Sequence, residues 1–108
     1  FQDISDLARD IALHHHQKWN GTGYAGPGTM GRLAGESIPL AARVTSVADV
    51  FDALVSPRCY KKPWPFEEAM DYLRAESGAA FDPLLVQCMV EMRDMLRLIY
   101  ARFPDAPA

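Results

Sequence analysis

Apolar side chains recur at helical spacing in four segments of this chain, which predicts four helices. The first segment covers residues 3–18, and the second covers residues 40–56. The stripe of the first segment, which we expect to be buried, consists of Ile4, Leu7, Ala8, Ile11 and His15. Its candidate N-caps are Asp3, Ser5 and Asp6. The apolar face of the second segment consists of Leu40, Val44, Val47, Ala48, Phe51, Leu54 and Val55.

Residue types at the ends of the other two segments set their predicted boundaries. The third segment, residues 66–77, follows Pro65 and is expected to end at a C-cap formed by Gly78. The fourth, residues 83–102, has Asp82 as its expected N-cap and a proline as its first residue. Its apolar stripe consists of Leu85, Met89, Met92, Leu96 and Ile99.

Helical periodicity is lost between Trp19 and Pro39, where six of the chain's seven glycines and two of its prolines lie. Irregular segments of this length inside compact domains are usually functional or disordered. No stretch alternates clearly enough to predict a strand. The sequence therefore predicts an all-α fold of about four helices with one long, irregular, Gly-rich loop.

Composition restricts the class of protein. A length of 108 residues allows one domain or part of one, and a hydrophobic content of 49% is ordinary for a globular protein. The net charge of −3 gives no basis for binding nucleic acid or a membrane surface through a bulk field. No apolar run approaches the ~18 residues of a membrane-spanning helix, so we expect a cytoplasmic protein. Because residue 1 is Phe1, we expect the chain to begin within a longer protein.

Three consecutive histidines stand at the expected end of the first helix, and imidazole is a common metal ligand. Successive helical positions point about 100° apart, so His15 and His16 suit two neighbouring ions or one ion at an irregular helix end. The alternative is that His15 packs in the apolar stripe while His14 and His16 are solvated. The sequence leaves both interpretations open.

A polar stripe runs along the second helix and consists of Thr45, Asp49, Asp52 and Ser56. It is either the solvated face of an amphipathic helix or a source of oxygen ligands. In the second case Asp49 binds a divalent metal, and Asp52 orients it or a neighbouring ligand. A mixed set of histidine and aspartate ligands suits Fe, Mn or Zn better than Ca or Mg.

The Gly-rich loop and the segment after the second helix hold candidate ligand-binding residues. Gly21 and Gly23 permit a ligand to approach the backbone closely, and Tyr24 is able to stack on a base. A tight turn with Tyr24 in the core accounts for the same residues. A basic cluster suited to phosphate follows the second helix and consists of Arg58, Lys61 and Lys62. Surface cations of this kind are also common without any ligand.

In their order along the chain, these motifs resemble the HD-GYP family of bacterial metal-dependent phosphodiesterases that act on cyclic di-GMP. The family pattern runs from two histidines and a glutamate, through an aspartate and Gly-x-Gly-Tyr-Pro, to Ile-Pro-Leu-x-Ala-Arg. It continues with Ala-Asp-x-x-Asp-Ala-Leu, then an arginine and a lysine. The matching segments here are His15-His16-Gln17, Asn20-Gly21-Thr22-Gly23-Tyr24-Ala25, residues 38–43, residues 48–54, Arg58 with Lys61, and Phe81-Asp82-Pro83. The similarity covers residues 8–90 and implies the C-terminal half of an HD-type helical domain.

The resemblance implies hydrolysis of cyclic di-GMP in bacterial signalling, by a metal-activated hydroxide. It implies that a bi- or trinuclear centre of Fe or Mn is bound by His15, His16 and Asp49. The residues that it implies in contact with the cyclic dinucleotide are Tyr24, Arg58 and Lys61. The expected supporting residues are Gln17, Asn20, Gly21, Gly23 and Asp52. Expected partners besides the dinucleotide are a second copy of the chain and signalling domains of the GGDEF or receiver type.

Departures from the family pattern leave two functions open. The family's His-Asp pair is expected upstream of Phe1, so this chain alone is not expected to turn over substrate. Gln17 and Asn20 replace carboxylates by amides, and the loss of such a supporting carboxylate typically costs about 10–100-fold in metal affinity or activity. Ala25 replaces the proline of Gly-Tyr-Pro. The chain therefore belongs either to an active phosphodiesterase or to a non-catalytic domain that senses a cyclic dinucleotide or binds a protein.

Overall fold

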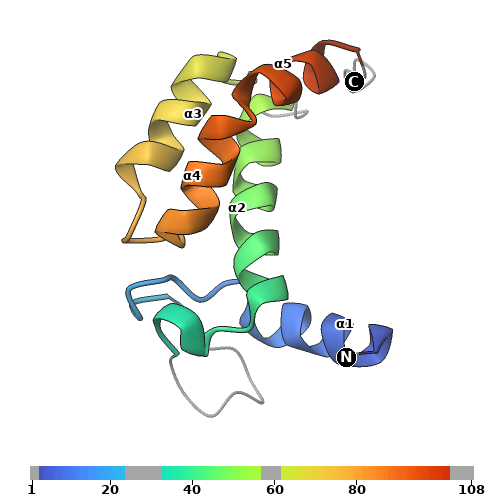
Figure 1. The fold of residues 1–108 in the computed structure, drawn as a ribbon, viewed down its shortest axis with the longest axis vertical. Helices are drawn as coiled ribbons and strands as arrows, with labels where there is room; N and C mark the ends of the chain where they lie inside the picture. Colours follow the sequence, from blue (N-terminus) through green and yellow to red (C-terminus); the bar gives the residue numbers. More distant parts are fainter. Residues whose placement is uncertain (1–2, 24–32, 57–61, 103–108) are drawn as a thin grey trace.

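A computed structural model describes residues 3–23, 33–56 and 62–102 of the chain. This part contains five α-helices and one short 3-10 helix, and it contains no strand (Figure 1). The elements are α1 (Ile4–His14), η1 (Gly35–Ser37), α2 (Leu40–Val55), α3 (Phe66–Ala75), α4 (Pro83–Glu91) and α5 (Arg93–Arg102). The predicted all-α fold is confirmed for these residues, with one helix more than expected.

Side chains at the helix starts behave largely as predicted. The Asp3 carboxylate caps α1 by accepting a hydrogen bond of 2.9 Å from the backbone N–H of Asp6. Asp82 caps α4 by accepting from the N–H of Leu84, also at 2.9 Å, and proline occupies the first helical position. In both places a carboxylate satisfies an N–H group that the helix itself leaves without a partner.

Two predicted boundaries are wrong at the C-terminal ends. Helix α1 ends at His14 rather than at Lys18, so His15 and His16 lie in a turn. Helix α3 ends at Ala75 with Glu76 as its C-cap, and the predicted cap Gly78 lies further along. Gly78 instead adopts a positive φ of 83° in the turn that leads to α4, where its N–H donates to the carbonyl of Phe81.

The predicted single helix over residues 83–102 is two helices separated at Met92, whose φ and ψ are −92° and 11°. The apolar stripe continues across this break, so periodicity alone does not reveal it. Contacts distant in sequence hold α5 in its own direction. Arg93 and Arg97 pair with Glu67 on α3, and the Tyr100 hydroxyl donates to Asp52 on α2 at 2.9 Å.

Helix α2 is the central element, with α3 and α4 packed along one side of it (Figure 1). Helix α1 crosses one end of α2 and α5 crosses the other, and both project in the same direction, so the chain has the outline of a C. The core lies where α2, α3 and α4 meet. Its buried residues are Val47, Phe51, Ala69, Met70, Leu73, Phe81 and Val86.

The predicted apolar stripes are only partly covered. No residue of α1 is buried, and Ile4 is 83% exposed, although α1 contacts α2. On α2 the buried residues are Ala42, Val47 and Phe51, whereas Leu40 and Val44 are 57% and 44% exposed. The expectation of a buried stripe on the first helix is therefore wrong.

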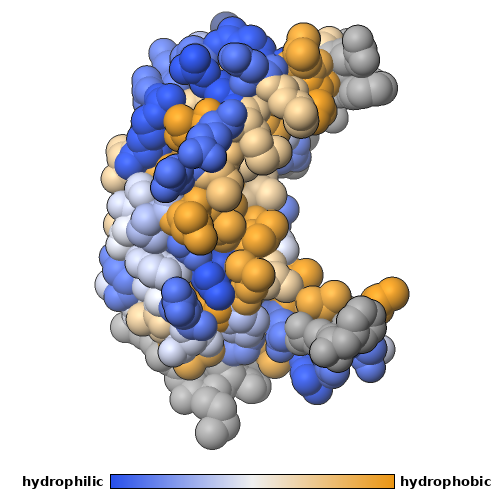
Figure 2. All heavy atoms as spheres, viewed as in Figure 1, coloured by the Kyte–Doolittle hydropathy of each residue, from blue (hydrophilic) through white to orange (hydrophobic). Residues whose placement is uncertain are grey.

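Exposed hydrophobic side chains gather along the inner side of the C (Figure 2). We call this surface the apolar band, and the exposed large hydrophobic residues of the elements that border it are Leu40, Val44, Leu84, Met92, Met95, Leu98 and Ile99. The first two lie on α2 and the others on α4, α5 and the residue between them. None of the helices in the described ranges is long and apolar enough to cross a membrane.

Candidate metal site

In the turn after α1, one ring nitrogen of His15 is hydrogen-bonded to the backbone, as is usual for histidines that bind metals. Its Nδ1 lies 2.7 Å from the carbonyl oxygen of Ile11. Because a carbonyl only accepts, Nδ1 must carry a proton and donate it, so in the neutral form of the ring the lone pair lies on Nε2. A backbone carbonyl that fixes one ring nitrogen in this way orients the other toward a metal.

His16 lies directly against His15, with ring centroids 3.9 Å apart. Its side chain is exposed, and it makes no hydrogen bond to the described residues. The two imidazoles therefore stand side by side at the start of the turn, where His15 itself keeps right-handed helical backbone angles of φ −69° and ψ −14°.

The ring of His14, in contrast, is hydrogen-bonded to the buried side chain of Gln17. The Oε1 of Gln17 accepts from the N–H of Leu33 at 3.0 Å, which fixes the orientation of the amide. Its Nε2 therefore donates to Nδ1 of His14, also at 3.0 Å, and the His14 proton lies on Nε2. Gln17 is 3% exposed, so this bridge ties the end of α1 to the far side of the loop.

Backbone hydrogen bonds fix the turn that follows the histidines. The N–H groups of Trp19 and Asn20 donate to the carbonyls of Ala80 and Ala79 at 3.1 and 2.9 Å. Gly23 is packed so closely that an added Cβ would lie 2.4 Å from the backbone nitrogen of Lys18. No larger residue fits there without moving the turn, which gives the glycine of the motif a steric role.

Asn20 and Gly21, predicted as supporting residues, also shape this turn. The Asn20 side-chain oxygen accepts from the N–H and the hydroxyl of Thr22 at 3.1 and 2.6 Å. Gly21 has a positive φ of 84° and donates its N–H to the carbonyl of Lys18. Both residues therefore act on the backbone rather than on the histidine rings.

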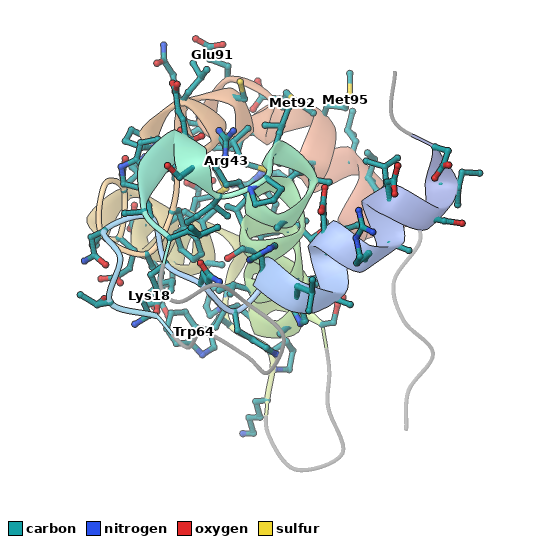
Figure 3. All side chains as sticks on the ribbon, turned by 90° about the horizontal axis from the view of Figure 1, so that it is seen from below. Lys18, Arg43, Trp64, Glu91, Met92 and Met95 are labelled. Carbon is teal, nitrogen blue, oxygen red and sulfur yellow. The ribbon has the colours of Figure 1, made fainter. Side chains whose placement is uncertain are left out.

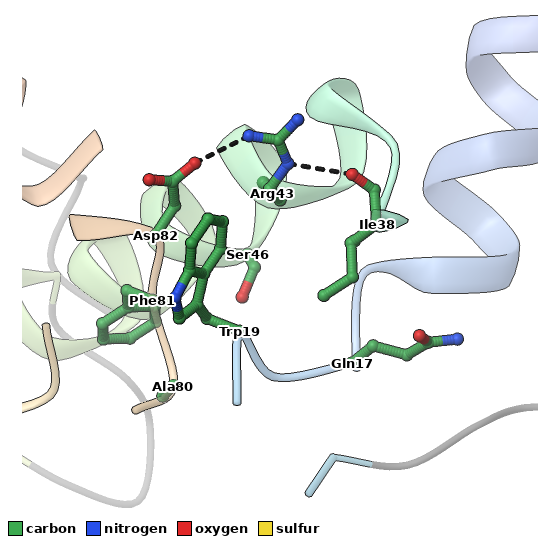
Figure 4. Close-up of a pocket in the computed structure, with 8 residues that line it drawn as sticks. All are labelled: Gln17, Trp19, Ile38, Arg43, Ser46, Ala80, Phe81 and Asp82. Atoms are coloured by element: carbon green, nitrogen blue, oxygen red, sulfur yellow. Dashed lines mark hydrogen bonds and ion pairs between the residues drawn. The ribbon is translucent and has the colours of Figure 1, made fainter. Parts of the chain in front are cut away.

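A buried ion pair attaches the loop and α2 to the start of α4 (Figure 4). Arg43 donates from Nη1 to Asp82 Oδ2 at 2.7 Å and from Nε to the carbonyl of Ile38 at 2.8 Å. Its guanidinium also lies 6.0 Å from the ring centroid of Trp19. The cavity left between these side chains is about 10 Å³, which is at most the space of one water, so this contact is structural.

The histidines line a larger hollow on α2. Two adjoining cavities of about 210 Å³ each share His15, His16, Ser46 and Val50 in their walls. Asp49 lines one of the two, together with Ala53. The structure thus brings the three predicted metal ligands, two histidines and Asp49, to one hollow.

The three predicted ligands do not form a closed metal site. Among the described residues, no group of three His, Cys, Asp or Glu side chains lies close enough together to hold an ion. Asp49 makes no hydrogen bond or ion pair within this part of the chain and is exposed. Two imidazole nitrogens and one carboxylate are ligands that suit a divalent metal. With only these three ligands, other coordination positions of the metal remain open.

Asp52, predicted to orient a metal ligand, is occupied elsewhere. Its Oδ1 accepts from the Ser56 hydroxyl at 3.2 Å and from the Tyr100 hydroxyl at 2.9 Å. It therefore joins α2 to α5 and does not line either cavity at the histidines. The predicted dinucleotide contacts Tyr24, Arg58 and Lys61 lie outside the described residues.

Of the residues with polar side chains that line the hollow, Lys18, Ser46 and Tyr72 were not predicted from the sequence. Lys18 follows the histidines directly, so its position next to that motif was an available signal. Ser46 lies one position off the predicted polar stripe, and Tyr72 comes from α3, more than fifty positions after the histidines. Nothing in the local pattern of α3 connects Tyr72 to the turn after α1.

Comparison with known proteins places this arrangement among HD domains. The HD domain family model matches residues 4–85. The chain is 45% identical over 98 residues to the cyclic di-GMP phosphodiesterase response regulator RpfG of Xanthomonas campestris, covering 91% of this chain and 25% of that protein. It is 42% identical over 102 residues to the 3'3'-cGAMP-specific phosphodiesterase 2 of Vibrio cholerae, covering 94% of this chain and 19% of that protein.

A solved structure also resembles this chain. It is the crystal structure of a cyclic GMP-AMP specific phosphodiesterase of Vibrio cholerae, with a TM-score of 0.62 and 28% sequence identity. The match covers 89% of this chain and 23% of that one. The chain therefore spans only about a fifth to a quarter of the length of these relatives.

Proposed function

We propose that this chain, which belongs to the HD domain family, forms part of a metal-dependent phosphodiesterase that hydrolyses cyclic di-GMP in bacterial signalling. The observation that carries the proposal is the tautomer of His15. Its Nδ1–H is held by the Ile11 carbonyl, so its free nitrogen is available beside His16, in the hollow that Asp49 also lines. The relatives named for hydrolysis of cyclic dinucleotides support the substrate class.

In this proposal His15, His16 and Asp49 hold divalent metal, with Fe or Mn as the expected ion in a bi- or trinuclear centre. A bound metal of this kind supplies an activated water and neutralises phosphoryl oxygens. The residues of this chain have separate tasks around it. The Ile11 carbonyl keeps the His15 ring in one orientation, and the close packing of Gly23 keeps the turn after His16 in place.

We propose further that the chain is the C-terminal part of an HD-type domain whose other metal ligands lie upstream. Two observations support this. The three ligands in the hollow make an open set, and the relatives are several times longer than this chain. The chain by itself is then inactive, because too few ligands are present to complete the centre.

The remaining contacts and partners follow from the same proposal. Tyr24, Arg58 and Lys61 contact the cyclic dinucleotide, through base stacking and through charge on its phosphates. The protein is cytoplasmic and forms a homodimer. It works together with a receiver or GGDEF-type signalling domain, and the response-regulator relative supports the first of these.

Hydrolysis of cyclic di-GMP by the full-length protein, supplied anaerobically with Fe or Mn, tests the proposal. We expect turnover that is lost on replacement of the ligand, in His16→Ala. The matched control is His14→Ala, since His14 is the adjacent imidazole but bonds to Gln17 instead of lining the hollow. The control should keep its turnover once its folding has been verified by circular dichroism.

The competing function is a non-catalytic domain that senses a cyclic dinucleotide or binds a protein. The observation in its favour is the buried amide of Gln17, which stands where the family has a carboxylate and has both of its polar groups satisfied. Binding of cyclic di-GMP without turnover, in protein shown to contain metal, would establish this second function and exclude hydrolysis.

A further inference from the structure

Among the described residues, the arginines form ion pairs and the lysines do not. Every arginine whose side chain the structure describes forms an ion pair with a carboxylate: Arg9, Arg43, Arg74, Arg93 and Arg97. The two described lysines, Lys18 and Lys62, form none with the described residues, and both are exposed. Of these two, only Lys18 lines the hollow beside the histidines.

The backbone of Lys18 is held firmly although its side chain has no partner in the described part of the chain. Its carbonyl accepts from the N–H of Gly21 at 2.9 Å, and Gly23 packs against its nitrogen. The residue before it, Gln17, is buried, and the residue after it, Trp19, donates its N–H to the carbonyl of Ala80. A flexible ammonium on a rigid turn suits an anion that enters the hollow.

An aromatic wall stands on the α3 side of the same cavity. Tyr72 lines it, packed edge-to-face against Phe81 and Trp64 at centroid distances of 6.4 and 5.8 Å. Tyr72 is 37% exposed, and its hydroxyl makes no hydrogen bond to the described residues. Lys18 and Trp64 lie on the same side of the molecule, away from Met92 and Met95 (Figure 3).

We propose that Lys18 and Tyr72 form a subsite of the hollow that binds one phosphate and one base of a nucleotide. Lys18 contacts the phosphate through its ammonium, and Tyr72 offers its ring to the base, as aromatic side chains do in sites for single-stranded nucleotides. The subsite rests on the proposed function, because it binds part of the same nucleotide whose phosphodiester group lies at His15 and His16. It adds two residues that the sequence analysis did not assign to a site.

Binding of GMP to the full-length protein tests this subsite, because GMP carries one base and one phosphate and is not a substrate of the proposed hydrolysis. We expect Lys18→Ala to raise the Kd for GMP about tenfold, the loss that corresponds to one charge-assisted hydrogen bond. Lys18→Arg should bind within a few-fold of the wild type. Lys62→Ala is the matched control, since it removes the other unpaired lysine, and it should leave the Kd unchanged.

Two further comparisons separate a contact with the ligand from a structural effect. Guanosine lacks the phosphate, so its Kd should be the same for the wild type and Lys18→Ala. Tyr72→Leu should weaken GMP about tenfold through loss of stacking, whereas Tyr72→Phe should not. Equal melting temperatures of the lysine variants would show that the fold is unaffected.

The outcomes distinguish the subsite from hydrolysis. GMP binding that depends on Lys18 supports the subsite even if cyclic di-GMP is not turned over, in which case only the proposed hydrolysis fails. Turnover of cyclic di-GMP together with equal GMP binding by Lys18→Ala overturns the subsite and leaves the hydrolysis standing. If the wild type binds neither GMP nor cyclic di-GMP, both proposals are overturned.

Discussion

At the scale of single residues, Gln17 and Asn20 are two amides in the place of family carboxylates, and the structure gives them different chemistry. Gln17 uses both ends of its amide, because it donates to His14 and accepts from the N–H of Leu33. Asn20 uses only its oxygen, which accepts twice from Thr22. A carboxylate at position 20 keeps both hydrogen bonds, whereas a carboxylate at position 17 keeps the bond from Leu33 and bonds to His14 only if the imidazole proton moves from Nε2 to Nδ1.

We therefore predict that Gln17→Glu destabilises the chain by about 1–3 kcal/mol, since it buries a carboxylate at a position that is 3% exposed and bonds to His14 only after the imidazole proton moves to Nδ1. Asn20→Asp should change the free energy of unfolding by less than about 0.5 kcal/mol, because both of its hydrogen bonds remain. Urea denaturation of the two variants measures the difference. Equal stability of the two variants would show that burying a carboxylate at position 17 carries no cost.

At the scale of elements, α2 carries two aspartates one turn apart that serve different ends of the molecule. Asp49 lines the hollow and has no bond to the described residues, whereas Asp52 receives the hydroxyls of Ser56 and Tyr100. Asp49→Ala should abolish or greatly weaken Mn²⁺ binding by the full-length protein and leave stability unchanged. Asp52→Ala should cost about 1 kcal/mol of stability and leave Mn²⁺ binding unchanged. Calorimetric titration and urea denaturation provide the two readouts.

The start of α4 depends on Asp82, whose two oxygens hold Arg43 and the N–H of Leu84. Asp82→Ala should cost about 3 kcal/mol or more, because it leaves a largely buried guanidinium without its counter-charge. Asp82→Asn should cost less, since its amide oxygen still caps the helix. The matched control is Asp71→Ala, which breaks an exposed pair with Arg74 and should cost less than about 1 kcal/mol. A cost for Asp82→Ala as small as for the control would show that the buried pair does not hold α4 in place.

Sequence patterns were sufficient for the elements but not for their coverage or their contacts. Caps such as Asp3 and Asp82 are local signals, so the helix starts were predictable from neighbouring residues. The break at Met92 was not, because it depends on ion pairs to α3 and on Tyr100 reaching α2. The pairing of the histidines with Asp49 followed from the family order, whereas Tyr72 reaches the hollow only through the packing of α3.

At the scale of the whole molecule, the apolar band exposes hydrophobic side chains to water, which is energetically unfavourable. Leu84, Met95 and Leu98 are 65%, 60% and 67% exposed along α4 and α5, and Leu40 continues the band on α2. Monomeric soluble proteins seldom expose contiguous apolar surface of this kind unless something covers it. A second copy of the chain is the occupant that we propose, and methionine side chains adapt readily to such a contact.

The chain should therefore self-associate, with a sedimentation coefficient that rises with concentration in the micromolar range. Met95→Glu places a charge within the apolar band and should shift the chain toward the monomer. Ala75→Glu is the matched control, because it adds the same charge at an exposed position on α3, outside the band. A chain that sediments as a monomer at high concentration would contradict self-association. If both variants dissociate equally, net charge rather than the apolar band governs the assembly, since only burial of the band distinguishes the two positions.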